Sequence, residues 1–243
     1  MDKRVVIVGA SSGIGREVAL LFLKAGWRVG VAARREENLK SLADQFPGQV
    51  VCRRIDVTDN GCVEQLSLLV DKLGGMDLYF HSSGIGSQNT ELEAEIENRT
   101  VDTNVVGFTK MVDYAFNYFR RRGHGQIGAI SSIASTRGLG PAPSYSATKA
   151  YQSHYLEALA QLSHSRGLGI TITDIRPGFV DTDLLAGDFH YPMKLKAEKV
   201  ARAIFKALEK RKAVATIDWR YRLLVFFWKL LPAPLWRRFK LVK

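Results

Sequence analysis

The chain has 243 residues, 46% of them hydrophobic, and a net charge of +11 at neutral pH. This length and apolar content suit a single domain with a sizeable core. The two cysteines, Cys52 and Cys62, have the spacing of neither a metal site nor a redox pair, which excludes those two classes of cysteine site. The chain starts without a signal-peptide pattern, so we expect a cytoplasmic protein in a reducing compartment.

The first apolar run, Val5 to Val8, is followed by a glycine-rich turn and then by helical periodicity over 17–24. Glycines allow a backbone to approach a pyrophosphate closely, and a helix N-terminus supplies free N–H groups and a positive dipole. We therefore predict that this turn binds the phosphates of a dinucleotide. The alternative is a turn that merely joins a strand to a helix. The predicted phosphate-binding residues are Gly9, Ser11, Ser12, Gly13, Ile14 and Gly15.

The second predicted strand, 28–33, ends in Ala33 and is followed by Arg34 and Arg35. A fold that selects NAD normally has an acidic residue near this point to hold the ribose 2′-hydroxyl, whereas arginine suits a 2′-phosphate. The two arginines therefore favour NADP(H) as the cofactor. The alternative is that they only start a solvated helix over 36–45.

Strands and helices alternate through the rest of the chain, up to residue 217. The predicted strands cover 50–55, 77–80, 127–130, 170–175 and 214–217, and the predicted helices cover 62–72, 91–122, 147–166 and 196–212. This alternation predicts an α/β fold in one domain, a doubly wound parallel sheet with helices on both faces. Asn104 and Gly107 lower the stability of the long helix that contains them, so they require a reason such as close packing or a bend.

A hydroxyl, a phenol and an amine gather between Ser132 and Lys149. Ser132 follows a predicted buried strand, so we expect its hydroxyl at the carboxyl end of the sheet, where open α/β folds bind their ligands. Tyr145 and Lys149 are four residues apart, which places them about one turn apart on one helix face. A free tyrosine titrates near pH ~10, and a nearby ammonium favours the phenolate, so the pair suits acid–base chemistry on a carbonyl or an alcohol. The alternative is a chance Tyr-x-x-x-Lys spacing.

Two further segments point to the same crevice. Asp56 follows the third predicted strand and is expected either to receive an adenine amino group or to cap its loop. A proline–glycine turn after strand 170–175 brings Pro177 to Thr182 to the carboxyl end of the sheet.

Gly9-x-x-x-Gly13-Ile14-Gly15, Asn104, Ser132 and Tyr145-x-x-x-Lys149 occur in this order, with Pro177-Gly178 behind them. Together these motifs resemble the short-chain dehydrogenase/reductase family over roughly residues 1 to 215. The resemblance implies a Rossmann fold and an NADP(H)-dependent oxidoreductase that interconverts a ketone or aldehyde and an alcohol. It also implies that hydride passes from NADPH to the carbonyl carbon while Tyr145 protonates the oxygen.

The resemblance assigns roles to single residues. Tyr145 is implied as the general acid/base, Ser132 as the holder of the substrate oxygen, and Lys149 as the group that tunes Tyr145 and binds the nicotinamide ribose. Asn104 is implied to hold a water that passes protons to Lys149. The remaining implied cofactor-binding residues are Asp56 and Val57 at the adenine, Ser82 and Gly84 after the fourth strand, and Pro177, Gly178, Val180 and Thr182 at the nicotinamide. No metal is implied.

The chain departs from the family pattern after the fourth strand, where Asn-Asn-Ala-Gly is usual and His81-Ser82-Ser83-Gly84 stands instead. Serines can still form hydrogen bonds, so we expect altered bracing of the strands and the ribose, not lost activity. His81 is interpreted as a structural histidine with satisfied hydrogen bonds. The alternative function, from another class, is a dinucleotide-binding regulatory or scaffolding protein attached to a membrane by its C-terminal tail.

A second departure is the C-terminal extension, 219–243, which we treat as separate from a Rossmann-type domain over 1–218. It holds seven basic residues, no acidic residue and three of the four tryptophans. Its apolar run over 223–228 is far shorter than the ~20 residues that span a bilayer, and Pro232 and Pro234 interrupt any longer helix.

Two interpretations of this basic, amphipathic extension stay open. Either it forms a pair of helices at a membrane surface, with cations on anionic lipid and aromatic rings at headgroup depth, or it packs on its own domain or a second subunit. Nucleic acid is disfavoured, because the aliphatic content exceeds what a phosphate-binding patch needs. In the first case the substrate is a lipophilic ketone, and the protein is peripheral on the inner face of a membrane. We also expect a homo-oligomer, a dimer or a tetramer, and an apolar substrate pocket near Phe189, Tyr191 and Met193.

Overall fold

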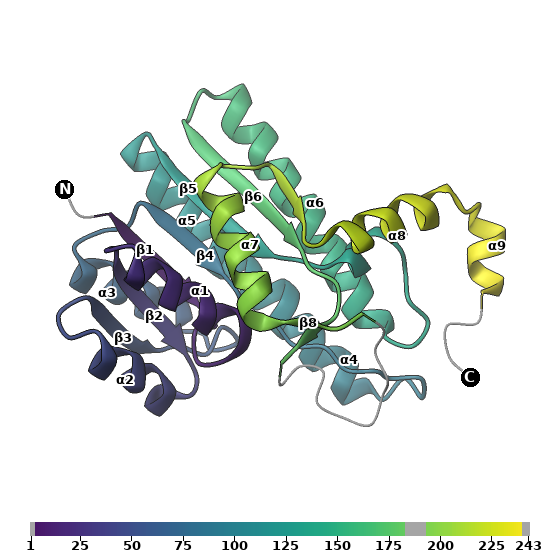
Figure 1. Ribbon diagram of the computed structural model, residues 1–243, viewed down its shortest axis with the longest axis horizontal. Coiled ribbons are helices and arrows are strands. Elements are labelled where there is room, and N and C mark those ends of the chain that lie inside the picture. Colours follow the sequence, from purple (N-terminus) through teal and green to yellow (C-terminus); the bar gives the residue numbers. More distant parts are fainter. Residues whose placement is uncertain (1–2, 183–192, 240–243) are drawn as a thin grey trace.

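The computed structural model of the protein describes residues 3–182 and 193–239. At its centre lies a parallel sheet of seven strands in the order β3-β2-β1-β4-β5-β6-β9 (Figure 1). The strands are β1 (Arg4–Val8), β2 (Arg28–Ala33), β3 (Val50–Arg54), β4 (Leu78–His81), β5 (Gly125–Ile130), β6 (Ile170–Arg176) and β9 (Val214–Thr216). The order reverses between β1 and β4, which is where doubly wound folds bind their ligands. The predicted doubly wound α/β fold is confirmed.

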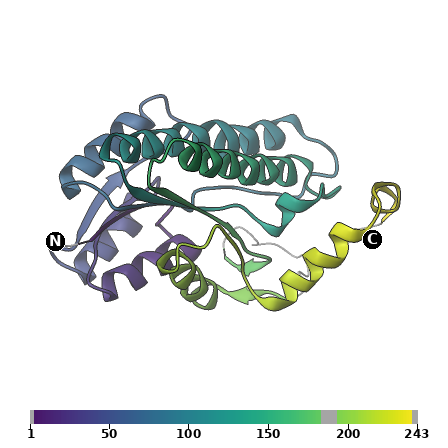
Figure 2. The ribbon, with the colours of Figure 1, turned by 90° about the horizontal axis from the view of Figure 1, so that it is seen from above.

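Helices cover both faces of this sheet (Figure 2). One face carries α1 (Gly13–Lys24), α2 (Glu36–Gln45) and α7 (Ala197–Glu209), and the other carries α3 (Cys62–Leu73), α5 (Phe108–Arg122) and α6 (Pro143–Ser165). Successive side chains of a strand point to opposite faces. Val5 and Ile7 of β1 therefore join the first core, while Val6 and Val8 join the second.

The predicted helix over 91–122 is confirmed from residue 94 onward, but it is not α-helical throughout. α4 (Ala94–Val101) begins later, and a π-helical segment, η1 (Asp102–Gly107), separates it from α5. A Cβ on Gly107 would lie 2.8 Å from the backbone oxygen of Val57, so close packing explains this glycine. Local periodicity could not show the contact with Val57, because it joins distant parts of the chain. Single π turns often occur at functional sites.

α6 begins at Pro143 and not at the predicted Ala147, in keeping with the preference of proline for the first helical turn. Tyr145 therefore lies inside the helix that also carries Lys149. Further short elements are a 3₁₀ helix, η2 (Ile133–Thr136), and a second sheet of two strands, β7 (Val180–Asp181) and β8 (Leu195–Lys196).

The C-terminal extension forms α8 (Trp219–Leu230) and α9 (Ala233–Arg238), at the end of the molecule opposite α2 and β3 (Figure 1). Asp218 caps α8, since its Oδ1 accepts a hydrogen bond from the Arg220 backbone N–H at 3.0 Å. The Arg220 side chain holds the pKa of this carboxyl well below its usual range. The boundary between a domain over 1–218 and an extension over 219–243 stays a prediction. Tyr221, in the first turn of α8, is fully buried. Within 3–182 and 193–239, every helix is too short or too polar to cross a membrane.

Tyr221 anchors α8 through its phenol oxygen. The Phe179 backbone N–H donates to this oxygen at 3.1 Å, and the hydroxyl donates to the Met193 carbonyl at 3.0 Å. Tyr221→Phe removes both bonds, so we expect it to lower the free energy of unfolding by about 1–3 kcal/mol, measured by denaturant titration. The control Tyr151→Phe removes a surface bond to Thr109 and should change stability by less than about 0.5 kcal/mol. Equal losses in the two variants would contradict this account.

Candidate active site

The carboxyl ends of β1, β4, β5 and β6 open into one cleft of about 1620 Å³. This volume exceeds the roughly 300–1,000 Å³ usual for a small-molecule site, so it suits an extended ligand together with a substrate. The predicted site residues that line it are Gly9, Ser11, Ser12, Gly13, Ile14, Arg34, Arg35, Asp56, Val57, Ser82, Gly84, Ser132, Tyr145, Lys149, Pro177, Gly178, Val180 and Thr182. Of the predicted cofactor-binding and catalytic residues, Gly15 and Asn104 do not line the cleft. Each packs against a glycine that does, Gly15 against Gly9 and Asn104 against Gly84.

The glycine turn packs tightly against the loop that follows β4. Gly9 has a φ of +91°, and a Cβ there would lie 2.5 Å from the backbone nitrogen of Ser83. A Cβ on Gly15 would lie 2.1 Å from the Gly9 carbonyl oxygen. Ser12 precedes α1 without capping it through its side chain, so the first N–H groups of α1 have no side-chain cap. This backbone fits a pyrophosphate, which takes its hydrogen bonds from such N–H groups.

Arg35 and two serines form a polar corner of the cleft. Arg35 Nη2 donates to Ser12 Oγ at 2.5 Å and to Ser11 Oγ at 3.3 Å, and Arg34 lines the cleft beside it. Both arginines are exposed. Guanidinium groups with neighbouring hydroxyls suit a phosphate monoester, so the corner fits a ribose 2′-phosphate. Arg35 also starts α2 as its N-terminal flanking residue, so the two interpretations of the arginine pair coexist.

Asp56 caps its own loop, one of the two roles that the sequence left open. Its Oδ1 accepts hydrogen bonds from Thr58, at 3.1 Å from the backbone nitrogen and 2.8 Å from Oγ1. Asp56 and Val57 still line the cleft, and their contact with an adenine stays a prediction.

Lys149 places a buried ammonium beside Tyr145. Its Nζ donates to the Ile130 carbonyl at 3.0 Å and to Gln152 Oε1 at 2.9 Å, and lies 5.8 Å from the centroid of the Tyr145 ring. Burial lowers the pKa of Lys149 from 10.5 to about 8, and the carboxylate of Asp174 raises it. The ammonium is therefore still charged at neutral pH.

Gln152 joins Lys149 to Asn104, and sequence reasoning missed it. Its Nε2 donates to the Asn104 backbone oxygen at 2.8 Å while its Oε1 accepts from Lys149. The amide thus links the Lys149 ammonium to the Asn104 backbone, and the water that the resemblance implied at Asn104 stays a prediction. Gln152 lies three residues after Lys149 on α6 and is fully buried. The helical spacing was visible in the sequence, but the burial was not.

The Asn104 side chain holds the loop after β4 against α6. Its Oδ1 accepts from the Ile85 backbone nitrogen at 2.9 Å, and its Nδ2 donates to the Ile85 carbonyl at 2.7 Å and to Thr148 Oγ1 at 3.1 Å. A Cβ on Gly84 would lie 3.2 Å from Asn104 Oδ1, which explains the glycine that this loop retains. Asn104 therefore braces the loop that lacks the family's two asparagines.

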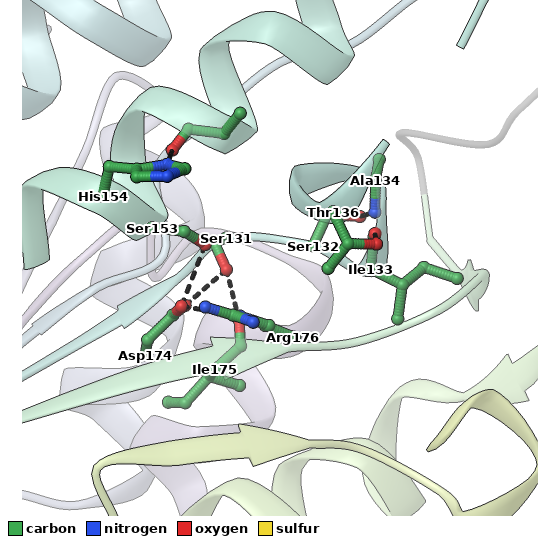
Figure 3. Close-up of polar contacts among 11 residues, drawn as sticks. Ser131, Ser132, Ile133, Ala134, Thr136, Ser153, His154, Asp174, Ile175 and Arg176 are labelled. Atoms are coloured by element: carbon green, nitrogen blue, oxygen red, sulfur yellow. Dashed lines mark hydrogen bonds and ion pairs between the residues drawn. The ribbon is translucent and has the colours of Figure 1, made fainter. Parts of the chain in front are cut away.

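A buried polar cluster surrounds Asp174 (Figure 3). The hydroxyls of Ser131 and Ser153 donate to its carboxylate, and Arg176 Nε forms an ion pair with it at 2.7 Å. These side chains come from β6, from α6 and from the end of β5, immediately before Ser132. The cluster therefore ties three elements together where Ser132 emerges, and sequence reasoning did not single out any of its members.

Ser132 and Tyr145 both reach the cleft from well-packed positions. Ser132 Oγ accepts a hydrogen bond from the Ala134 backbone nitrogen at 3.1 Å, so its own hydrogen is left to donate. The Tyr145 ring lies against Gly86, where a Cβ would approach the ring to 2.4 Å. Close packing of this kind fixes the direction of the phenol.

His81 is a buried structural side chain that does not line the cleft. Its Nδ1 shares a hydrogen bond of 2.8 Å with the Tyr79 hydroxyl. Its Nε2 makes no hydrogen bond to a side chain or backbone group of the described residues, so full satisfaction of both ring nitrogens stays a prediction. Burial, with a contribution from Lys149, lowers the pKa of His81 to about 3, so its ring is neutral at neutral pH.

A doubly wound sheet with a phosphate-compatible glycine turn and a Ser, Tyr and Lys set in one cleft defines the class of nucleotide-dependent oxidoreductases. Residues 3–190 match the short chain dehydrogenase family, and the chain belongs to it. The family resemblance drawn from the motifs is thus confirmed. Members of this class use a nicotinamide cofactor, and the protein is an oxidoreductase that acts on CH–OH and C=O groups.

Similar proteins agree with this assignment. An uncharacterized oxidoreductase of Myxococcus xanthus is 31% identical over 240 residues, which cover 96% of this chain and 94% of that protein. The structure of ElxO with NADP bound is 28% identical, has a TM-score of 0.81 and matches 92% of this chain and 100% of its own. A 3-ketoacyl-(acyl-carrier-protein) reductase from Brucella melitensis, complexed with NADH, is 25% identical with a TM-score of 0.81, over 89% of this chain and 96% of its own.

The Asp174 cluster has a testable effect on Lys149. Asp174→Asn removes the negative charge that raises the pKa of Lys149 and keeps a carbonyl oxygen for the serines. We expect the pKa of Lys149 to fall below about 8, so that the ammonium loses its proton at lower pH. An NMR titration of the lysine ¹³Cε signals measures this, with Lys149→Arg to assign the signal. Glu157→Gln, at an exposed carboxylate on α6, should leave the pKa of Lys149 unchanged. An unchanged or raised pKa in Asp174→Asn would contradict the assignment.

Proposed function

We propose that the protein is an NADP(H)-dependent carbonyl reductase in which Tyr145 is the general acid. The observation that carries the proposal is that Ser132, Tyr145 and Lys149 line the same cleft as the glycine turn. The preference for NADP(H) rests on Arg34 and Arg35 at the polar corner. ElxO carries NADP and the Brucella melitensis reductase carries NADH, so the neighbours alone do not decide between the two cofactors.

The chain's own residues supply the proton chemistry of this reaction. The bound nicotinamide supplies the hydride. Ser132 donates its remaining hydrogen to the substrate oxygen and stabilises the charge that develops there. Tyr145 gives its proton to the same oxygen, and the Lys149 ammonium stabilises the phenolate left behind. In the oxidation direction the same groups act in reverse.

Asn104 and Gln152 act through Lys149 in this scheme. Gln152 holds the ammonium through one amide atom and the Asn104 backbone through the other. We therefore propose Asn104 as a positioning residue of the site. Lys149 remains the proposed contact for the nicotinamide ribose, and Ser82 and Gly84 stand beside it in the cleft.

The proposed substrate is an apolar, lipid-like ketone. Apolar side chains from η2 and its following loop, from the β6–β7 connection and from the C-terminal helices line the cleft, among them Ile133, Leu139, Phe179, Leu224, Phe227, Trp228, Leu231 and Trp236. Such a wall stabilises an apolar ligand by removing its surface from water. Of the residues expected near the substrate, Phe189 and Tyr191 lie outside the described residues, and Met193 is exposed.

The proposal also covers the oligomeric state of the protein and its location in the cell. We propose a cytoplasmic homo-oligomer that is peripheral on the inner face of a membrane. Exposed apolar side chains at Val101 and Val106 supply a surface for a second subunit. Cys52 and Cys62 are free thiols, which suits a reducing compartment.

Tyr145→Phe tests the acid directly. It removes the proton donor and keeps the ring against Gly86, so we expect kcat to fall by about 10²–10⁴-fold while the Kd for NADPH stays close to that of the parent protein. Tyr151→Phe, on the exposed side of α6, should retain turnover. Full turnover in Tyr145→Phe would contradict the role. A parent protein that binds NADPH but reduces no ketone would instead support the regulatory or scaffolding alternative.

Arg34→Ala tests the cofactor preference. Loss of a charged hydrogen-bond donor to the 2′-phosphate should weaken NADPH binding by about 1–3 kcal/mol, or about 5- to 150-fold in Kd, and leave NADH binding unchanged. Fluorescence titration with both cofactors measures the two constants. Lys40→Ala, at an exposed cation on α2 paired with Glu36, should change neither. Equal losses for NADPH and NADH, or none, would contradict the assignment.

A further inference from the structure

α8 is apolar on two opposite faces, each with the helical spacing of three and four residues. The inner face packs on the domain and consists of Tyr221, Leu224, Val225 and Trp228. The outer face is exposed and consists of Trp219, Leu223, Phe226 and Leu230. The exposed fraction is 63% at Trp219 and 64% at Leu230, at the two ends of the helix. An apolar helix face is normally covered, and the described residues cover only the inner face of α8.

Cations border the outer face. Arg222 and Lys229 are exposed along α8, and Arg237 and Arg238 are exposed on α9. Arg220 is partly neutralised by its ion pair with Asp218, at 2.9 Å. The chain has no acidic residue between 219 and 239. The two helices therefore expose apolar side chains together with cations that no acidic residue of the same segment offsets.

The domain fixes the direction of this surface. Trp228 Nε1 donates to Thr136 Oγ1 at 2.8 Å, and Trp236 Nε1 donates to the Gly138 carbonyl at 2.8 Å. Arg137 donates to backbone carbonyls at the end of α8 and stacks over the Trp236 ring at 5.7 Å. These bonds hold α8 and α9 against the loop after η2, so the outer face points away from the domain.

The outer face is continuous with the substrate end of the cleft. Phe227, Leu230 and Phe239 line the cleft and are also exposed, by 63%, 64% and 61%. An apolar surface thus runs from the outside of α8, over the ends of both helices, to the cavity that holds Ser132 and Tyr145.

We propose that the outer face docks on an anionic lipid surface, so that an apolar ketone reaches the cleft from the bilayer. An interfacial helix of this kind buries aromatic and aliphatic side chains at the headgroup boundary and places its cations on anionic lipid. The inner face then packs on the domain, and the outer face contacts the lipid. The substrate part of this inference rests on the proposed reductase function.

Charge distinguishes the lipid surface from a second copy of the chain. A two-fold contact brings the same patch of both subunits together. Here that contact would gather Arg222, Lys229, Arg237 and Arg238 of both chains in one interface, with no acidic side chain in the patch to offset them. Anionic headgroups offset them directly.

The test uses the full chain and vesicles of phosphatidylcholine, alone or mixed in equal parts with phosphatidylglycerol. We expect co-sedimentation with the mixed vesicles, weakened by salt, and little with phosphatidylcholine alone. The double variant Leu223→Ser/Phe226→Ser changes only outer-face residues that do not line the cleft, and should bind the mixed vesicles at least tenfold more weakly. The control Leu68→Ser/Leu162→Ser changes two exposed leucines on α3 and α6 and should bind like the parent protein.

Activity separates this inference from the proposed function. All variants should reduce a short, water-soluble ketone at the parent rate, and only the outer-face variant should lose rate with a long-chain ketone dissolved in the mixed vesicles. Vesicle binding that is equal in the outer-face variant and the parent overturns the docking surface. So does a parent protein that ignores mixed vesicles but forms a dimer that the outer-face variant loses. Vesicle binding without reduction of any ketone overturns the proposed function and leaves the docking surface standing.

Discussion

A lysine ammonium kept charged inside the protein is the constraint on which the site depends. Burial alone disfavours the charge of Lys149, and three groups oppose that effect: the Ile130 carbonyl, the Gln152 amide and the Asp174 carboxylate. They come from the end of β5, from α6 and from β6. β5 ends two residues before Ser132, α6 carries Tyr145, and Asp174 of β6 accepts a hydrogen bond from Ser131. The packing that keeps Lys149 charged therefore also places the groups proposed to act on the substrate oxygen.

The sequence predicted what local patterns determine. Apolar runs predicted the seven strands, and the glycine-rich segment predicted the turn between β1 and α1, where only glycine fits at Gly9 and Gly15. The spacing of Tyr145 and Lys149 predicted that their side chains lie close together, because four residues make about one helical turn. In each case the evidence lay within a few adjacent residues.

Contacts between distant segments escaped prediction. Gln152 and Asp174 contribute to the site because they are buried and bind residues on other elements. The spacing of residues in the sequence reveals neither property. The π-helical segment and the close approach of its Gly107 to Val57 were not visible in the periodicity of 91–122. The orientation of the C-terminal extension also escaped prediction. Its sequence is apolar on both sides of α8 and could not show which side faces the domain, and the structure puts Tyr221 inside and Phe226 outside.

The proposed reaction of these parts is the transfer of hydride, in the cleft beside Lys149, from a nicotinamide to the carbonyl carbon of an apolar ketone. The most direct measurement is isotope transfer. The full chain is incubated with a long-chain ketone and NADPH deuterated on the transferable C4 position, and the alcohol is analysed by mass spectrometry and NMR. The account predicts deuterium on the carbinol carbon, on one stereochemical face. An alcohol without deuterium at that carbon, from either C4-deuterated form of NADPH, would contradict it.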